Sequence, residues 1–282
     1  MKRLMLIGSL FLFGCSAPLP TPTGAESTQP AEDMPQVTQP PVSDQAAVAL
    51  LPPGPVTMVA LGDSLTQGDG DDSGIGYPGR LLVLVNSIRP DSTMTNLGQS
   101  GWNSDALIHG DQGLESQLDR AVAELQAATS QGNAAIAFVW IGSNDLWYLY
   151  EYGGDVNAEG NVQDSLHFAT NMDLIISRLR STGAAVFVAL LDDQSQRPVA
   201  LKGEAFASVT RDELGQMSLQ VQRYNEIINE KSAQYGAQTV DFYHTDIFTN
   251  PATLYDDGNH PNQAGYELIA QKWYETLSPL LQ

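Results

Sequence analysis

From Val56 onwards, hydrophobic and polar positions follow two alternating patterns. Five short apolar runs, rich in β-branched residues, predict β-strands: Val56–Leu61, Thr93–Leu97, Ala134–Ile141, Ala185–Leu191 and Gln238–Phe242. The longer stretches after these runs carry apolar residues at helical spacing and predict helices: 78–89, 114–130, 164–182, 212–235 and 262–280. Such alternation indicates one α/β domain, assigned to residues 55–282, with a parallel sheet covered by helices on both faces.

The first residues show a different hydrophobic pattern. Met1–Arg3 is a short basic segment, and Leu4–Phe13 is an apolar run that is too short for a membrane-spanning helix of about 20 residues. The run leads into a sequence around Cys15 that resembles a bacterial lipobox, although Phe13 is bulkier than is usual there. We predict that residues 1–14 are a lipoprotein signal peptide and that Cys15 carries the lipid. The alternative is an ordinary secretory signal with an incidental cysteine.

Residues 15–54 are rich in Pro, Thr, Gln, Ser and Ala and contain little material for a hydrophobic core. Prolines keep such a segment extended, and its low hydrophobicity gives it nothing to bury. We predict a disordered linker that holds the domain away from a membrane surface. The predicted location is therefore outside the cytoplasm, anchored through Cys15 or, in the alternative, secreted.

The charge of the chain is strongly acidic. Lys and Arg number 13 against 33 Asp and Glu, which gives a formal net charge of -20 at pH 7. A negative field repels phosphate backbones, so nucleic acid is not an expected partner, and anionic lipids are disfavoured. Because Cys15 is the single cysteine, the chain has no intramolecular disulfide and no cysteine-based zinc site.

A serine directly follows the first predicted strand. Residues 61–68 read Leu-Gly-Asp-Ser-Leu-Thr-Gln-Gly, which places Ser64 beyond the carboxyl end of the strand, where open parallel sheets bind their ligands. The flanking glycines permit a tight turn. Ser64 is either exposed to a substrate or the N-cap of a following helix, and this segment alone does not decide between the two.

An Asp–His pair precedes the last predicted helix. Asp257 stands three residues before His260. A serine becomes a good nucleophile when a base takes its proton, and a histidine base works best when a carboxylate fixes its tautomer. Asp257 and His260 are candidates for these roles, with helix capping as the alternative for His260. The other histidines, His109, His167 and His244, are expected to lack such a neighbour.

Two further loops offer hydrogen-bond donors. The loop after the second predicted strand contains Gly101, and the loop after the third contains Asn144. A tetrahedral intermediate of acyl transfer is stabilised by preorganised donors, commonly backbone N–H groups and an amide side chain. Gly101 and Asn144 supply one of each.

Taken together, four blocks of this sequence resemble those of the SGNH, or GDSL, hydrolase family. The resemblance covers almost all of residues 56–280, and the blocks follow one another in the family's order. They are Gly62–Leu65, Asn96–Gly101, Gly142–Asp145 and Asp257–Asn262. A single block of this kind is weak evidence, whereas four in order on successive loops are specific.

The resemblance implies a fold and a set of roles. The fold is a flavodoxin-like three-layer α/β/α sandwich, unlike that of α/β-hydrolases, whose Gly-x-Ser-x-Gly motif this chain lacks. Ser64 corresponds to the nucleophile, and Asp257 and His260 to the catalytic pair. The backbone N–H groups of Ser64 and Gly101 and the side chain of Asn144 correspond to the oxyanion hole.

These roles predict a carboxylic ester hydrolase that forms an acyl-enzyme and requires no metal or organic cofactor. The expected substrates are short-acyl or carbohydrate-linked esters. The alternatives are lysophospholipase or thioesterase activity on longer acyl chains, or a non-catalytic lipoprotein that binds a glycan or an acyl chain. The sequence does not indicate an oligomeric state.

Three aromatic residues near these loops are candidates for substrate contacts. Trp147 and Tyr148 follow Asn144 directly, and Trp102 follows Gly101, where the family has polar residues and where its bulk narrows the acyl pocket. Aromatic side chains line many binding clefts. Packing in the core is the alternative for this cluster.

Three other polar segments invite interpretation. Residues 69–74 and 155–160 look like the start of calcium loops, but Arg80 and Leu166 stand where an EF-hand requires its bidentate glutamate. We interpret both segments as solvated acidic turns rather than metal sites. The long polar stretch 192–211 is predicted to be a lid or specificity loop.

Overall fold

The computed structural model describes residues 50–152, 157–203 and 208–282. The predicted signal peptide, Cys15 and all but the last residues of the predicted linker lie outside these ranges, as does Asp155 of the second calcium-like segment. Within the described part of the chain, no helix has the length and hydropathy needed to cross a bilayer.

Over the described residues, five parallel strands form one sheet in the order β2-β1-β3-β4-β5. The strands are β1 Val56–Gly62, β2 Thr93–Asn96, β3 Ala134–Trp140, β4 Ala185–Leu190 and β5 Gln238–Asp241. Each lies on one of the predicted apolar runs, and the order is that of flavodoxin-like sheets. In register, Val59 of β1 lies between Thr95 of β2 and Ala137 of β3. The predicted fold class is confirmed.

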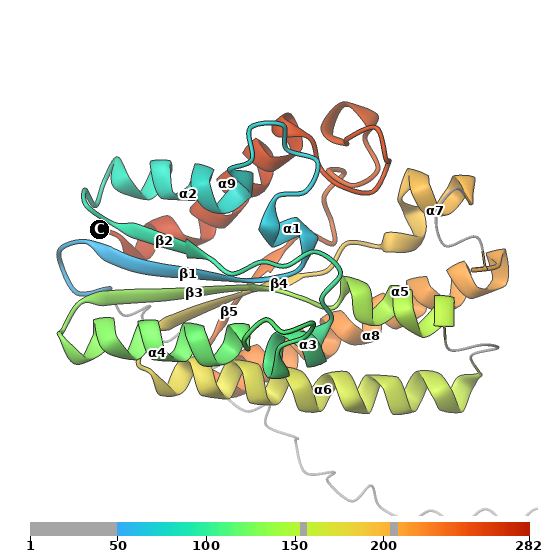
Figure 1. Cartoon of the computed structure of the whole chain (residues 1–282), viewed down its shortest axis with the longest axis horizontal. Coiled ribbons are helices and arrows are strands. Elements are labelled where there is room, and N and C mark those ends of the chain that lie inside the picture. The colour runs from blue at the N-terminus through green and yellow to red at the C-terminus, as the bar shows by residue number, and fades with distance from the viewer. Residues whose placement is uncertain (1–49, 153–156, 204–207) are drawn as a thin grey trace, which may run out of the picture. The chain divides into compact units, whose positions relative to one another are not determined.

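The longer helices form a layer on each side of the sheet. Figure 1 shows α2 and α9 on one face and α4, α6 and α8 on the other. The α-helices of the described residues are α1 Ser64–Gln67, α2 Gly76–Asn86, α3 Ser104–His109, α4 Gln117–Ser130, α5 Ser143–Tyr152, α6 Ala158–Ser181, α7 Pro198–Lys202, α8 Arg211–Tyr235 and α9 Gln263–Leu277. The three-layer architecture follows from the apolar stripe that each long helix presents to the sheet.

Aromatic residues fill the space between the sheet and its helices. On the side of α9, Trp140 of β3 stacks on Phe242, with ring centroids 4.2 Å apart, and Trp273 lies edge-on to Phe138. On the other side, Phe168 of α6 stacks on Tyr224 of α8 at 3.8 Å. Large buried rings contribute much of the apolar area that holds such layers together.

Side-chain amides continue the hydrogen bonding of two strands beyond their ends. Gln117 of α4 pairs with both backbone groups of Gly62, at the end of β1. Asn225 of α8 does the same for Leu191, the first residue after β4. Both amides are buried. They satisfy backbone groups that would otherwise be unpaired and fix the strand ends from which the loops of the site depart.

The structure differs from the predicted helix boundaries in one informative place. Helix α6 begins at Ala158, six residues before the predicted start, because the side chain of Asn157 caps it by accepting a hydrogen bond from the backbone N–H of Gly160. The described part of the second calcium-like segment is therefore the cap and first turn of a helix.

Candidate active site

Ser64 is the first residue of the short helix α1, which begins immediately after β1. The side chain of Asp63 caps this helix by accepting from the N–H of Leu65 at 2.9 Å. The turn leaves no room for a side chain at Gly62, where a Cβ atom would stand 2.2 Å from the carbonyl oxygen of Trp140. Asp63, rather than Ser64, is thus the N-cap, and the Ser64 side chain remains available for chemistry.

A continuous chain of contacts joins Ser64 to His260 and Asp257. The Oγ atom of Ser64 lies 2.9 Å from Nε2 of His260, and Nδ1 of His260 lies 2.6 Å from Oδ2 of Asp257. An Nδ1–H that donates to Asp257 leaves Nε2 to accept the proton of Ser64. This is the arrangement that activates a serine hydroxyl.

The turn that carries Asp257 and His260 is held by its own backbone. Oδ1 of Asp257 accepts from the N–H groups of Asn259 at 2.8 Å and of His260 at 2.9 Å. Burial alone would raise the pKa of Asp257, but the hydrogen bonds from His260 and Asn259 lower it to about 2. The carboxylate therefore stays ionised and holds the imidazole in one orientation.

The loop that follows helix α1 packs directly against this turn. A Cβ atom on Gly70 would stand 2.6 Å from the carbonyl oxygen of Pro261 and 3.0 Å from Cβ of His260. The φ of Gly70 is 86°, a conformation that glycine adopts without strain. Only glycine therefore permits this close approach behind His260.

The loop that carries Gly101 is bonded to the nucleophile helix. The side chain of Asn96 donates to the carbonyl of Thr66 at 2.8 Å, and the N–H of Ser100 donates to Oε1 of Gln67. A Cβ atom on Gly98 would stand 2.3 Å from the nitrogen of Gln67. The second sequence block is thus pressed against the helix that begins at Ser64.

The three expected oxyanion donors lie on these connected loops. Asn144, in the first turn of α5, donates one N–H of its amide to the carbonyl oxygen of Trp102 at 2.8 Å, which leaves the second N–H for a ligand. Among the described residues, no group accepts a hydrogen bond from the backbone N–H of Ser64 or Gly101. These donors are available to a developing negative charge.

A polar network, buried at Ser104 and Asn171 and partly exposed at Asp105 and His167, connects helices α3, α5 and α6. Asp145 accepts hydrogen bonds from the backbone N–H and the hydroxyl of Ser104. Asn171 of α6 donates to Ser104 and to Asp105, which is ion-paired with His167 at 2.8 Å. Desolvation raises the pKa of Asp145 to about 6 although the Ser104 donors oppose the shift. The network fixes helices α3 and α5 next to the predicted oxyanion donors.

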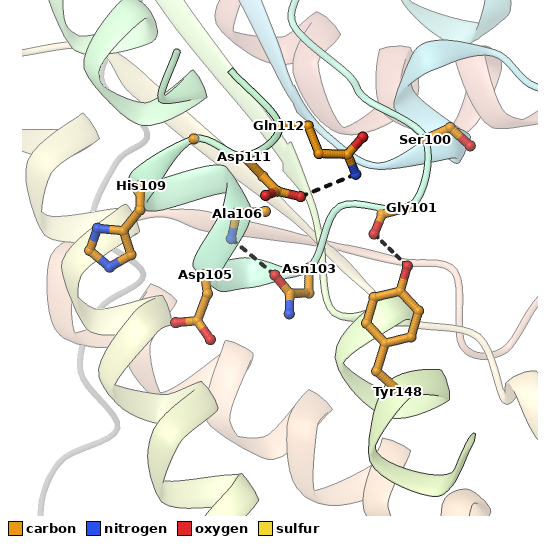
Figure 2. Close-up of a pocket in the computed structure, with 10 residues that line it drawn as sticks. Ser100, Gly101, Asn103, Asp105, Ala106, His109, Asp111, Gln112 and Tyr148 are labelled. Atoms are coloured by element: carbon orange, nitrogen blue, oxygen red, sulfur yellow. Dashed lines mark hydrogen bonds between the residues drawn. The ribbon is translucent and has the colours of Figure 1, made fainter. Parts of the chain in front are cut away.

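A polar cavity of about 380 Å³ adjoins Gly101 (Figure 2). Figure 2 shows Tyr148 at one side of it, with its hydroxyl donating to the carbonyl oxygen of Gly101 at 2.7 Å. Most other lining side chains are polar: Ser100, Asn103, Asp105, His109, Asp111 and Gln112. A ligand whose carbonyl group reaches Gly101 therefore has a hydrophilic space beside it.

Of the three aromatic residues predicted to contact substrate, Tyr148 alone lines this cavity. Trp147 is 2% exposed and belongs to a hydrophobic cluster with Tyr150 and Met217. Trp102 is 4% exposed and meets the site through its carbonyl oxygen. The burial of the two indole rings argues against the predicted substrate contacts of Trp102 and Trp147 and favours the packing alternative.

The expectation that His167 and His244 lack a carboxylate partner was wrong. His167 pairs with Asp105, and Asp241 stands three residues before His244 and bonds its N–H and Nδ1 just as Asp257 bonds those of His260. The two Asp–His pairs differ in that Ser64 contacts the histidine of one of them, His260.

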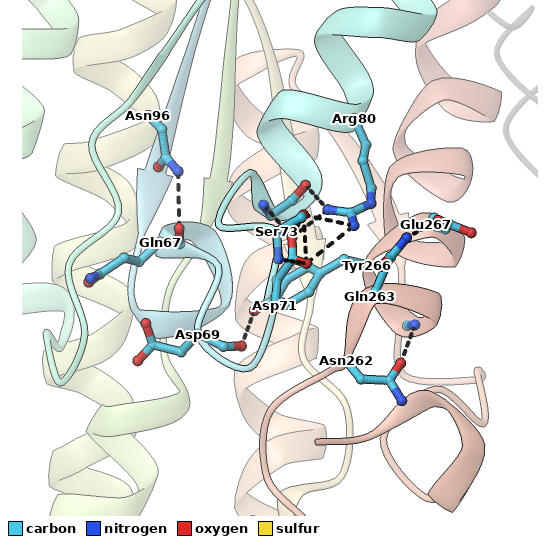
Figure 3. A network of polar contacts seen from close by, with 12 residues as sticks. Gln67, Asp69, Asp71, Ser73, Arg80, Asn96, Asn262, Gln263, Tyr266 and Glu267 are labelled. Carbon is cyan, nitrogen blue, oxygen red and sulfur yellow. Dashed lines mark hydrogen bonds and ion pairs between the residues drawn. The ribbon is translucent and has the colours of Figure 1, made fainter. Parts of the chain in front are cut away.

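In the first calcium-like segment, Asp72, Ser73 and Gly74 are exposed, as expected of a solvated turn, but Asp71 is buried and paired with Arg80 (Figure 3). Arg80 donates to the carboxylate of Asp71 at 2.5 Å, and Ser73 and the N–H of Gly76 donate to it as well. Burial alone would raise the pKa of Asp71, but these donors lower it to about 2. Arg80 thus binds the carboxylate from the position where a calcium loop has a glutamate. No cluster of three or more His, Cys, Asp or Glu over residues 50–152, 157–203 and 208–282 is placed to hold a metal ion.

Sequence patterns did not indicate how the predicted lid, residues 192–211, packs; residues 204–207 of it lie outside the described residues. Residues 192–202 contain a 3₁₀ turn and helix α7, and Arg197 within them is buried against Asp192 and Asn259. The only available signal was a charged pair, Asp192 and Arg197, within a polar stretch.

Comparison with known proteins agrees with this geometry. The chain matches the model of the GDSL-like Lipase/Acylhydrolase family over residues 60–268. It is 26% identical over 229 residues to the uncharacterized protein YpmR of Bacillus subtilis (strain 168), a match that covers 79% of this chain and 81% of that protein.

Several solved structures, two of them of esterases, share the fold. The acetylxylan esterase Axe2 from Geobacillus stearothermophilus is similar with a TM-score of 0.53 and 17% identity, over 80% of this chain and 94% of that one. The psychrotrophic esterase EstA from Pseudoalteromonas sp. gives 0.52 and 17%, over 80% and 98%. TesA gives 0.52 and 19%, over 79% and 99%.

The sheet order and the loops at its carboxyl edge define an SGNH-type hydrolase fold. The chain belongs to the GDSL-like lipase/acylhydrolase family and is a carboxylic ester hydrolase.

Proposed function

We propose that the protein hydrolyses short-acyl esters of hydrophilic, carbohydrate-like alcohols through an acyl-enzyme on Ser64. The observation that carries this proposal is the unbroken contact chain from Asp257 through His260 to Ser64, with distances of 2.6 and 2.9 Å.

The geometry supports a two-step acyl transfer. Oγ of Ser64 attacks the ester carbonyl while Nε2 of His260 takes its proton, and Asp257 stabilises the resulting imidazolium. The backbone N–H groups of Ser64 and Gly101 and the amide of Asn144 hold the oxyanion. The intermediate collapses as His260 protonates the departing alcohol. Water, deprotonated by His260, then attacks the acyl-enzyme, and the acid leaves as Ser64 regains its proton.

The polar lining of the cavity beside Gly101 supports the proposal that the alcohol group of the ester is hydrophilic. Its side chains are mainly carboxylates, amides, an imidazole and a phenol, which hydrogen-bond to hydroxyl groups but give a long acyl chain little apolar surface. Axe2, whose fold is similar, is an acetylxylan esterase. Both points favour acetyl or other short acyl groups on a sugar over lysophospholipids and acyl thioesters.

The test is a substrate panel with the full-length protein. It comprises p-nitrophenyl acetate, butyrate and palmitate, acetylated xylooligosaccharides and palmitoyl-CoA. We expect kcat/KM to fall with acyl length and to be highest for an acetyl ester, and Ser64→Ala to lose about a millionfold in kcat. A preference for palmitoyl substrates would replace this proposal by the long-acyl alternative. Full activity of the Ser64→Ala protein would end it.

We also propose that the enzyme acts outside the cytoplasm, tethered to a membrane by a lipid on Cys15. The basic start, the short apolar run and the cysteine of the sequence support this location. Expressed in a bacterium, the protein should partition into the detergent phase and carry a lipid-modified Cys15 in mass spectrometry, whereas Cys15→Ser should do neither. An unmodified, secreted wild-type protein would favour the ordinary signal peptide.

A further inference from the structure

The segment Asp192–Lys202 lies directly against the turn that carries Asp257 and His260. The N–H of Val199 donates to the carbonyl oxygen of Gly258 at 3.1 Å. A Cβ atom on Gly258 would stand 3.1 Å from Cβ of Pro198. The catalytic turn is therefore packed against a segment that follows a different strand, β4.

Arg197 is the centre of this contact and is 2% exposed. Its Nε and Nη2 donate to the two carboxylate oxygens of Asp192 at 2.8 and 2.7 Å. Its Nη1 donates to Oδ1 of Asn259 at 2.9 Å, and its Cζ lies 4.6 Å from the centroid of the Phe248 ring. The planar guanidinium is thus fixed along two edges and on one face, a geometry that lysine does not reproduce.

Asn259 connects this guanidinium to the catalytic pair. It lies between Asp257 and His260, and its own backbone N–H donates to Oδ1 of Asp257, the oxygen that also accepts from the N–H of His260. A change in the backbone conformation at Asn259 would therefore move the N–H groups that donate to Asp257. It would also move the backbone from which the His260 side chain extends. Asp192 in turn follows Leu191, which Asn225 holds at the end of β4.

We propose that Arg197 is a positioning residue, which acts through Asn259 to hold Asp257 and His260 in line with Ser64. Arg197 links the rigid end of β4 to a turn that contains two of the three reacting side chains. Small displacements of a catalytic group cost large factors in rate. Loss of this link therefore lowers kcat by a larger factor than it changes KM. The inference rests on the proposed roles of Ser64, His260 and Asp257.

A double-mutant cycle tests the link in the full-length protein. Arg197→Met, Asn259→Ala and the double variant are compared with wild type for kcat and KM on p-nitrophenyl acetate, corrected for the folded fraction by near-ultraviolet circular dichroism. We expect each single variant to lose about 10- to 100-fold in kcat with KM within about threefold. The double variant should be no slower than the worse single variant, because both changes break one link.

Arg89→Met is the matched control. Arg89 is also buried, but it donates to the carbonyls of Pro52, Gly54 and Leu281, near the start of β1 and thus at the opposite end of the sheet from Ser64. This variant should melt at a lower temperature and keep the kcat of wild type. A parallel loss of kcat in Arg89→Met would mean that burial of an arginine, not its link to Asn259, explains the effect.

A second readout does not depend on turnover. The downfield proton resonance of the Nδ1–H of His260, assigned with His260→Ala, reports the hydrogen bond to Asp257. It should weaken or shift in Asn259→Ala, which leaves the Arg197–Asp192 pair in place, and persist in Arg89→Met. An unchanged resonance and kcat in folded Asn259→Ala, or losses that multiply in the double variant, would overturn the proposal. If the wild-type protein hydrolyses no ester but the resonance changes as expected in the variants, the result would count against the proposed function and not against the positioning role of Arg197.

Discussion

The side-chain amide of Gln117 and the backbone of Gly62 form two hydrogen bonds, from the N–H of Gly62 to Oε1 at 2.8 Å and from Nε2 to its carbonyl oxygen at 2.9 Å. Gly62 is the last residue of β1, two positions before Ser64. A residue of α4 thus fixes the end of the strand from which the nucleophile turn departs.

This pairing predicts a specific loss of stability. Gln117→Leu keeps the apolar stem but leaves a buried backbone N–H without its acceptor, which costs about 1–3 kcal/mol. Urea denaturation of the variant should show a lower midpoint with an unchanged slope. Gln126→Leu, on an exposed position of the same helix, should stay within about 0.5 kcal/mol of wild type. Equal stabilities of the two variants would contradict the structural role of the Gln117 amide.

The buried carboxyl group of Asp63 predicts a pH-dependent stability. Burial raises its pKa from 3.8 to about 7, against the opposing effects of the Leu65 N–H and the Arg197 charge. Because the folded state holds the proton more tightly than the unfolded state, ionisation costs stability increasingly as the pH rises from about 4 to 7, and the full cost, on the order of 4 kcal/mol, applies above pH 7.

Asp63→Asn keeps an acceptor for the N–H of Leu65 and removes this titration. The stability of the variant relative to wild type should therefore increase between pH 5 and pH 8 in thermal melts. A difference that stays constant over this interval would show that the pKa of Asp63 is not raised in the folded protein.

Asn144 should act on the transition state. Removal of a single oxyanion donor costs about a hundred- to thousandfold in kcat, and we expect this loss in Asn144→Ala with little change in KM. Asn133→Ala, an exposed asparagine just before β3, serves as the control and should leave kcat unchanged. An effect on KM alone would make Asn144 a substrate-binding residue.

Tyr148 should distinguish large from small alcohol groups. Its ring borders the cavity beside Gly101, so Tyr148→Ala should raise KM for an acetylated oligosaccharide by about tenfold, the effect of losing roughly 1.4 kcal/mol of binding. The KM for p-nitrophenyl acetate, which does not fill the cavity, should change less than threefold. Equal changes for both substrates would place the alcohol group elsewhere.

The fold was predictable because its signals are local and repeated. The three central strands β1, β3 and β4 are apolar runs in which residues such as Val59 and Phe138 are buried, and each long helix has a periodic apolar face. The structure also placed Ser64 beside His260 at the carboxyl edge of the sheet, as the positions of their loops after β1 and β5 led us to expect.

The missed features depend on contacts between distant residues. Arg197 meets Asn259, 62 positions further along the chain, and no periodicity marks such a pair. Trp147 follows Asn144 directly in the sequence, which made it a candidate for substrate contacts, but the helical rotation of α5 turns it into a hydrophobic cluster and leaves Tyr148 at the cavity. The position of a residue in the sequence shows that its helix lies near the site. The packing of that helix decides which of its side chains face the cavity.

The central claim, an activated Ser64, is tested most directly by a fluorophosphonate probe on the full-length protein, with the labelled residue located by mass spectrometry. We predict labelling at Ser64 that is abolished in His260→Ala and retained in His244→Ala, because both histidines bond to an aspartate but Ser64 contacts His260. A folded wild-type protein that is not labelled, or labelling that survives His260→Ala, would contradict the account.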